Sequence, residues 1–231
     1  MQTISFYNLS LTLLPLIFVW YFYYKWTGDN KEVIYSTVRM VIQLLLIGYL
    51  LLFIFEEKNA LIGFFIIAFM CVVSTWITLR NTDDKSQKHY LTIFAAITLS
   101  GVIHLILIIG FVLNLESLYE PRYVIPIAGM IFANTMNAVS LCVERFEKES
   151  LHNIGFEQAR KIAFKASMIP QINTLLAVGL VALPGMMTGQ ILSGIDPLIA
   201  VRYQIMIMTM MISSSGISVI IYFLLKKRNN S

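Results

Sequence analysis

Residues 177–211 read AVGLVALPGMMTGQILSGIDPLIAVRYQIMIMTMM, and this stretch decides what kind of fold the chain can adopt. It is apolar enough to lie in a bilayer, yet it contains Pro184, Gly185 and the pair Asp196-Pro197 where a simple membrane anchor would carry leucine. Proline removes a backbone donor and clashes with the preceding turn, so a helix through Pro184 must kink or break. A broken helix is tolerated in a membrane only where protein or a water-filled cavity satisfies the freed backbone groups, and such breaks mark transporter binding regions. The stretch therefore predicts a transport site.

The composition indicates an all-α, polytopic membrane protein. Of the 231 residues, 58% are hydrophobic and only 13% are charged, which is far more apolar than a soluble domain. A spanning helix needs about 20 apolar residues, and we predict seven such helices within a single permease domain, 1–231, in the plasma or inner membrane. The predicted spans are 6–24, 38–55, 60–79, 91–113, 122–142, 171–193 and 201–225.

The distribution of basic residues predicts the orientation. Most of the 17 lysine and arginine residues fall on one predicted side, and only Lys58, Arg122 and Arg202 fall on the other. Because positive residues concentrate on the inner side of a membrane, we expect the N-terminus outside and the C-terminus inside. The net charge of +4 then reflects topology and contact with anionic membrane lipid, and we expect no nucleic-acid partner.

The sequence carries no motif for catalysis. It lacks the glycine-lysine phosphate loop, the GxSxG elbow, the dinucleotide fingerprint and zinc-type spacing. We therefore expect a transport subunit and not an enzyme, with no cofactor bound by this chain and no metal ligands that can be assigned. The energy for transport must come from a gradient or from a partner.

Several polar residues lie where the predicted spans are otherwise apolar. Gln43 and the pair Asn134 and Asn137 each have two interpretations, because an amide in hydrocarbon either bonds a neighbouring helix or lines a polar path. Met186 and Met187 belong to a methionine cluster that favours adaptable packing, although thioethers can also bind soft metal ions. The same choice arises for His104, for which we expect a structural hydrogen bond over a proton relay or metal ligand.

Residues 144–170 form the longest predicted inner segment. Its apolar residues recur at helical spacing, which predicts short amphipathic helices at the membrane surface. The elements Glu149-Ser150-Leu151, Gly155 and Ile169-Pro170 resemble the coupling loop of ABC importer permeases.

The motifs VIPIAGMIFANTM, GLVALPGMMTGQILSGIDP and RYQIMI, with the earlier RMVIQL, together resemble one family of permeases. This is the permease subunit of the FetA–FetB type of iron exporter, with related plant aluminium-tolerance half-transporters. The resemblance runs from Arg39 to Tyr222, and Ala133 stands where the family usually has glycine. It implies an ABC-type permease that works as a homodimer with a separate ATPase subunit, which binds the ATP. It also implies export of iron by the bacterial members.

Two sets of residues follow from these patterns and from the resemblance, and a gradient-driven, seven-helix secondary carrier of a small solute remains the alternative. The expected transport path comprises Gln43, Asn134, Asn137, Pro184, Gly185, Met186, Met187, Asp196 and Gln204. The expected ATPase contact comprises Glu149, Leu151, Ile154, Gly155 and Phe156.

Overall fold

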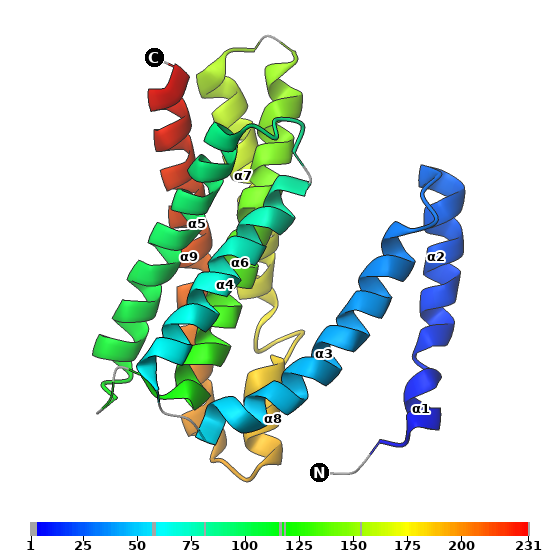
Figure 1. Ribbon diagram of the computed structural model, residues 1–231, viewed down its shortest axis with the longest axis vertical. Coiled ribbons are helices and arrows are strands. Elements are labelled where there is room, and N and C mark those ends of the chain that lie inside the picture. The colour runs from blue at the N-terminus through cyan, green and yellow to red at the C-terminus, as the bar shows by residue number, and fades with distance from the viewer. Residues whose placement is uncertain are drawn as a thin grey trace. The chain divides into compact units, whose positions relative to one another are not determined.

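The computed structural model describes residues 4–56, 59–80, 82–115, 117, 119–152 and 154–230. Within these ranges every regular element is helical, which confirms the all-α prediction (Figure 1). Contacts divide the chain into two compact units, Met1–Glu57 and Lys58–Ser231. The prediction of one permease domain stays a prediction.

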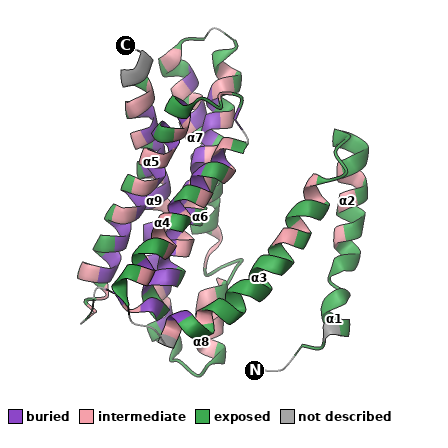
Figure 2. Cartoon of the chain, in the orientation of Figure 1, coloured by how far each residue is buried: buried purple, intermediate pink, exposed green. Residues whose placement is uncertain are grey.

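The first unit consists of α1 (Phe6–Ser10), α2 (Leu13–Thr27) and α3 (Glu32–Glu56). Pro15 lies in the first turn of α2, where it cannot donate to the carbonyl of Leu11, so the predicted first span is divided into two helices. Asp29 begins α3 by accepting the backbone N–H groups of Lys31 and Glu32 at 2.8 and 3.2 Å. Most of its apolar side chains are exposed within the chain (Figure 2), so this unit depends on lipid or a partner to cover them.

The second unit is a bundle centred on α6 (Pro121–Ser150). This helix contacts α4 (Ala60–Arg80), α5 (Gln87–Ile106), α7 (Phe156–Ala177) and α9 (Pro197–Asn230). The short α8 (Gly185–Leu192) packs on α9, and a π-helical turn, η1 (Leu107–Val112), extends α5. The buried residues of the unit concentrate between these helices (Figure 2).

A glycine allows α5 and α6 to pack closely in this bundle. The backbone of Gly101 in α5 lies so near the buried ring of Phe132 in α6 that an added Cβ would be 2.3 Å from it. Gly129 and Ala133 of α6 are spaced one helical turn apart, a pattern that favours close helix packing, but outside the backbone of its own helix no heavy atom of the described residues lies within 4 Å of a Cβ added to Gly129. Ala133 is exposed, so this small-residue face of α6 remains open within the chain.

Five of the predicted spans are single helices that are long and apolar enough to cross a membrane: Glu32–Phe55, Ala60–Arg80, Gln87–Val112, Pro121–Ser150 and Pro197–Lys227. Most of these helices extend past the limits predicted for the spans, because polar residues at their ends continue the helix beyond the apolar stretch. The remaining two predicted spans, 6–24 and 171–193, are interrupted. The multi-pass architecture is therefore confirmed, while the count of seven and the orientation stay predictions.

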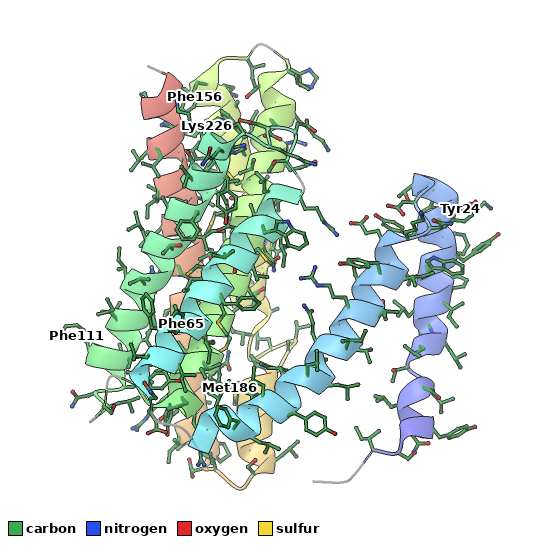
Figure 3. All side chains as sticks on the ribbon, in the orientation of Figure 1. Tyr24, Phe65, Phe111, Phe156, Met186 and Lys226 are labelled. Carbon is green, nitrogen blue, oxygen red and sulfur yellow. The ribbon has the colours of Figure 1, made fainter. Side chains whose placement is uncertain are left out.

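The bundle has two chemically different ends. Figure 1 shows α4, α6 and α9 running in one direction and α5 and α7 in the other. The α4–α5 connection, the α6–α7 turn and the C-terminal end of α9 therefore meet at one end, which we call the inner end. Phe156 and Lys226 lie there, whereas Phe111 and Met186 lie toward the opposite end (Figure 3). Three charged connecting or terminal segments of the second unit are therefore grouped at this end.

Cysteine labelling tests which end faces the cytoplasm. In a parent carrying Cys71→Ala and Cys142→Ala, we expect a membrane-impermeant maleimide to label Ser117→Cys in intact cells and to leave Lys85→Cys unlabelled. Both positions are exposed in the structure, so access to the reagent depends on the membrane. Permeabilised cells provide the control, since both cysteines should then react. Labelling of Lys85→Cys alone in intact cells would reverse the orientation.

Candidate functional site

The helix break predicted near Pro184 is present, and it begins earlier than the proline. α7 ends at Ala177, whose carbonyl oxygen accepts the backbone N–H groups of Leu180, Val181 and Ala182 at 2.8 to 3.2 Å. Gly179 has a φ of 83°, a left-handed conformation that glycine adopts without a Cβ clash. The chain therefore closes a tight turn before it reaches Pro184, whose extended backbone begins α8.

A pocket of about 360 Å³ lies between this turn and α9, and we call it the break pocket. It brings together three of the predicted transport-path residues, Pro184, Met187 and Gln204. Gln204 is only 5% exposed, and neither polar atom of its amide has a hydrogen-bond partner among the described residues. On α8, the side-chain oxygen of Gln190 is likewise buried without such a partner, which sequence reasoning did not single out.

The two amides of α6 lie elsewhere. Asn134 donates from Nδ2 to the carbonyl of Met130 at 2.8 Å within its own helix, and its side chain is half-buried. Asn137 is exposed within the chain, on the same open face as Ala133. Neither residue is among those that line the break pocket. The structure therefore separates the α6 amides from the site at the helix break.

The other predicted path residues have more local roles. Asp196 accepts the backbone N–H groups of Leu198 and Ile199 at 2.8 and 3.4 Å, so it caps the start of α9. Gly185 is the first residue of α8, and Met186 packs against the buried core of the bundle. Gln43 is exposed and belongs to the first unit.

His104 has the structural role that we expected. Its Nδ1 atom lies 2.8 Å from the carbonyl oxygen of Ser100, one turn earlier in α5, and the side chain is buried. The hydroxyl of Ser100 in turn donates to the carbonyl of Ser214 on α9 at 2.7 Å. This polar contact joins α5 to α9 inside the bundle.

At the inner end, the predicted loop 144–170 consists mainly of helix. Residues up to Ser150 continue α6, and Phe156 already begins α7, so Pro170 lies inside a helix and does not end the segment. At 30 residues, α6 is about 45 Å long, whereas the hydrocarbon core is about 30 Å thick. α6 is therefore longer than the core of a membrane is thick.

The short turn between these helices depends on Gly155. Its φ of 77° and ψ of 153° belong to a region that is essentially restricted to glycine, which explains the predicted glycine turn. Leu151 is 77% exposed beside it, and Ile154 is also exposed. By contrast, Phe156 makes edge-on contacts with the rings of Phe146 and Phe223.

Two grooves flank this turn, and both are lined by Gly155 and Phe156. The first inner groove, of about 630 Å³, adds Leu151 and the charged residues Asp83, Asp84, Glu147 and Lys226. The second inner groove, of about 840 Å³, adds Ile154 and a rim that includes Glu157, Arg160 and Lys161. Of the predicted contact residues, only Glu149 lines neither groove, and it pairs with Arg145 at 2.7 Å.

No local sequence pattern predicts the cluster of charged residues that borders the first inner groove, which we call the charged anchor. Glu147 accepts the backbone N–H groups of Asp83 and Asp84 at 2.9 and 3.4 Å, which ties the α4–α5 connection to α6. Lys226 of α9 lies 3.7 Å from the Asp84 carboxylate. The backbone N–H of Ser86 lowers the pKa of Asp84, so its charged form is favoured.

His89 completes this anchor. Its Nδ1 atom lies 2.8 Å from the carbonyl oxygen of Asp84, and its Nε2 atom lies 3.3 Å from the hydroxyl of Tyr222 on α9. Both side chains are buried. His89 Nδ1 also lies 3.9 Å from Glu147 Oε1, 58 positions later in the chain, so no local sequence pattern points to this pair.

Comparison with known proteins places the chain among membrane proteins. The model of the Uncharacterised protein family (UPF0014) matches residues 6–155 and 154–230. The chain is 36% identical over 223 residues to the Probable iron export permease protein FetB of Escherichia coli (strain K12), covering 87% of this chain and 83% of that protein. It is 31% identical to the UPF0014 membrane protein YjkA of Bacillus subtilis (strain 168), covering 93% and 90% of the two chains.

A plant relative extends this set. The chain is 29% identical over 204 residues to Protein ALUMINUM SENSITIVE 3 of Arabidopsis thaliana, covering 81% of this chain and 72% of that protein. No solved structure matches the chain.

The turn at the helix break can be tested through Gly179. A Gly179→Ala substitution places a Cβ on a left-handed backbone, which costs about 1–2 kcal/mol. We expect the apparent melting temperature in lipid nanodiscs to fall by about 2–8 °C and the amides of residues 178–182 to exchange faster with deuterium. Gly48→Ala is the matched control, because Gly48 lies in a helix with open space around it. Equal melting temperatures and equal exchange rates for the two variants would contradict the requirement for glycine at position 179.

Proposed function

Because this chain belongs to the UPF0014 family of membrane proteins, we propose that it is the permease subunit of an ABC-type exporter for iron or a related metal ion, powered by a separate ATPase subunit. The name of the Escherichia coli relative, an iron export permease, supports the substrate and the direction. The observation that carries the ATPase assignment is the pair of inner grooves around Gly155.

The inner end has the features of a docking surface for a second protein. Leu151 and Ile154 expose apolar side chains at the tip of two projecting helices, where they face water unless a partner covers them. Phe156 fixes the turn to the bundle through its ring contacts, so a force on the tip acts on α6, α7 and α9 together. A permease without a nucleotide-binding motif needs such a surface to receive work from ATP hydrolysis.

The open face of α6 supports a homodimer. Asn137 is exposed on this face within the chain, and an amide that contacts lipid tails lacks hydrogen-bond partners. A second copy would cover Asn137 and bring the small residues Gly129 and Ala133 against another helix. In such a dimer the α6 amides would line or seal a path between the protomers, while each break pocket provides the flexible element that changes access.

Substitutions in the α6–α7 turn test the ATPase contact. Covering a leucine side chain contributes roughly 1.5–3 kcal/mol, so we expect Leu151→Glu to weaken binding of the co-expressed ATPase at least tenfold and to reduce coupled ATP hydrolysis. His152→Glu is the matched control, because it adds the same charge to the same exposed turn without removing an apolar contact. Phe156 is unsuitable for this test, since its substitution would disturb the aromatic cluster.

The measurements are co-purification of the ATPase from membranes and the melting temperature of each permease variant. An unchanged melting temperature with lost co-purification supports the proposal. Retention of the ATPase by Leu151→Glu would remove this surface as the contact. Transport at full rate by the unmodified chain without any ATPase would instead favour the secondary carrier.

A further inference from the structure

The second inner groove, between α7 and α9, has an apolar floor that continues onto the outer surface of α9. Its lining includes Ile220 and Leu224 of α9, which are 46% and 64% exposed within the chain. Ile217 lies one turn before Ile220 on the same face of the helix and is also exposed. We call these three residues the α9 stripe. The stripe leads from the apolar part of α9 into the groove, and in a membrane it depends on lipid or a partner to cover it.

The rim of the groove carries an excess of positive charge. Arg160 and Lys161 of α7 line it, and Glu157 is the only acidic residue among the described residues that do so. The Glu157 carboxylate pairs with Arg160 and lies 3.4 Å from the ammonium group of Lys227 on α9. Lys161 and, one turn later, Lys165 are exposed and form no ion pair with a described residue. The basic side chains around the groove therefore outnumber the one carboxylate available to them.

The apolar floor and the basic rim meet where each helix changes its character. The part of α9 that is apolar enough to span a membrane ends at Lys227, three residues after Leu224. Across the groove on α7, Lys161 precedes the exposed apolar side chain of Ile169 by about two turns. A change from apolar to basic residues is typical of helices at a membrane surface. The groove therefore lies at the level of the lipid headgroups.

From this combination we infer that the second inner groove binds an anionic phospholipid, whose acyl chain lies on the α9 stripe and whose phosphate group contacts Arg160 and Lys161. An acyl chain can reach the groove along the lipid-facing side of α9, which a water-soluble ATPase cannot. A negative headgroup matches the rim, because basic residues near a membrane surface attract anionic lipids. The groove volume of about 840 Å³ is in the range of small-molecule sites.

The inference goes beyond the proposed function and does not depend on it. A lipid held between α7 and α9 leaves Leu151 and the first inner groove open for the proposed ATPase contact. Ile154 lines the second inner groove and is also exposed at the turn, so the lipid would lie directly beside the ATPase.

Photolabelling of the purified permease in phosphatidylcholine nanodiscs, without the ATPase, tests the inference. One probe is phosphatidylglycerol with a diazirine in one acyl chain, and the other is phosphatidylcholine with the same labelled chain. We expect mass spectrometry to find about fivefold more adduct on residues 217–224 with the anionic probe than with the zwitterionic probe at equal concentration. Phe65, Phe69 and Val72 form an exposed apolar stripe on α4, which bulk lipid should label equally with both probes.

Variants decide whether the basic rim is responsible. Arg160→Gln combined with Lys161→Gln should remove the preference for the anionic probe at residues 217–224. Lys85→Gln combined with Lys148→Gln is the matched control, because it removes two positive charges from exposed residues outside the groove, and it should retain the preference. If the first double variant fails to fold, Lys161→Gln alone, a change at an exposed residue, should reduce the preference.

Three results would overturn the inference. Equal labelling of residues 217–224 by both probes in the unmodified permease would leave the groove to a protein partner. An undiminished preference in the variant that lacks Arg160 and Lys161 would show that the rim does not bind the headgroup. Loss of the preference in inorganic phosphate, but not in sodium chloride of the same ionic strength, would identify a site for a free anion. None of these measurements involves the ATPase, so the inference can fail while the proposed coupling surface stands.

Discussion

A backbone that leaves its helix inside a bilayer has no water to bond its N–H and C=O groups, and this constraint governs the arrangement around residues 177–184. The chain satisfies this constraint because three backbone N–H groups donate to the carbonyl of Ala177 and the backbone turns at Gly179. Because the turn satisfies its own backbone hydrogen bonds, a new helix, α8, begins at Gly185 and packs on α9. The pocket that contains Gln204 exists because two helix segments, and not one continuous helix, face α9 at this point.

Two long helices connect the break to the inner end. α7 begins at the groove-lining Phe156 and ends at the turn, and α9 carries Gln204 near one end and Lys226 near the other. Helices are stiff along their axes. A displacement applied at the inner grooves would therefore be transmitted to the break pocket with little decrease in size. The least regular part of the bundle lies where these two helices and α8 meet, which makes it the natural place for the displacement to be absorbed.

The sequence predicted the fold class well because its signals are local. Apolar runs of spanning length, the proline at position 184 and the glycine at position 155 each act on their own neighbourhood, and the structure contains the expected helices, break and turn. The limits of the helices were less predictable, since α6 and α7 continue past the apolar residues through turns whose charged side chains pair within each helix. The predicted first span is divided because Pro15 disrupts the turn that precedes it, an effect that the predicted limits of the span did not include.

The site could be predicted only in part. Pro184, Met187 and Gln204 lie near one another because the break folds a short stretch of chain back onto α9. The separation of Asn134 and Asn137 from that pocket depends on how α6 is rotated in the bundle, which hydrophobic pattern alone leaves open. The anchor formed by Glu147, Asp83 and Asp84 joins residues that are distant in sequence. In the sequence these charged residues are indistinguishable from ordinary solvated surface residues, and only the fold brings them together.

The amides of α6 also affect the insertion of this helix into the membrane during synthesis. This helix is less apolar than α4 or α5, and its exposed Asn137 raises the free energy of transferring it alone from the translocon into lipid. Its buried face matches α4 and α5, which precede it during synthesis. The central helix of the bundle would therefore enter the membrane most readily when its two predecessors are still beside the translocon, so that assembly of the core and insertion of α6 become a single event.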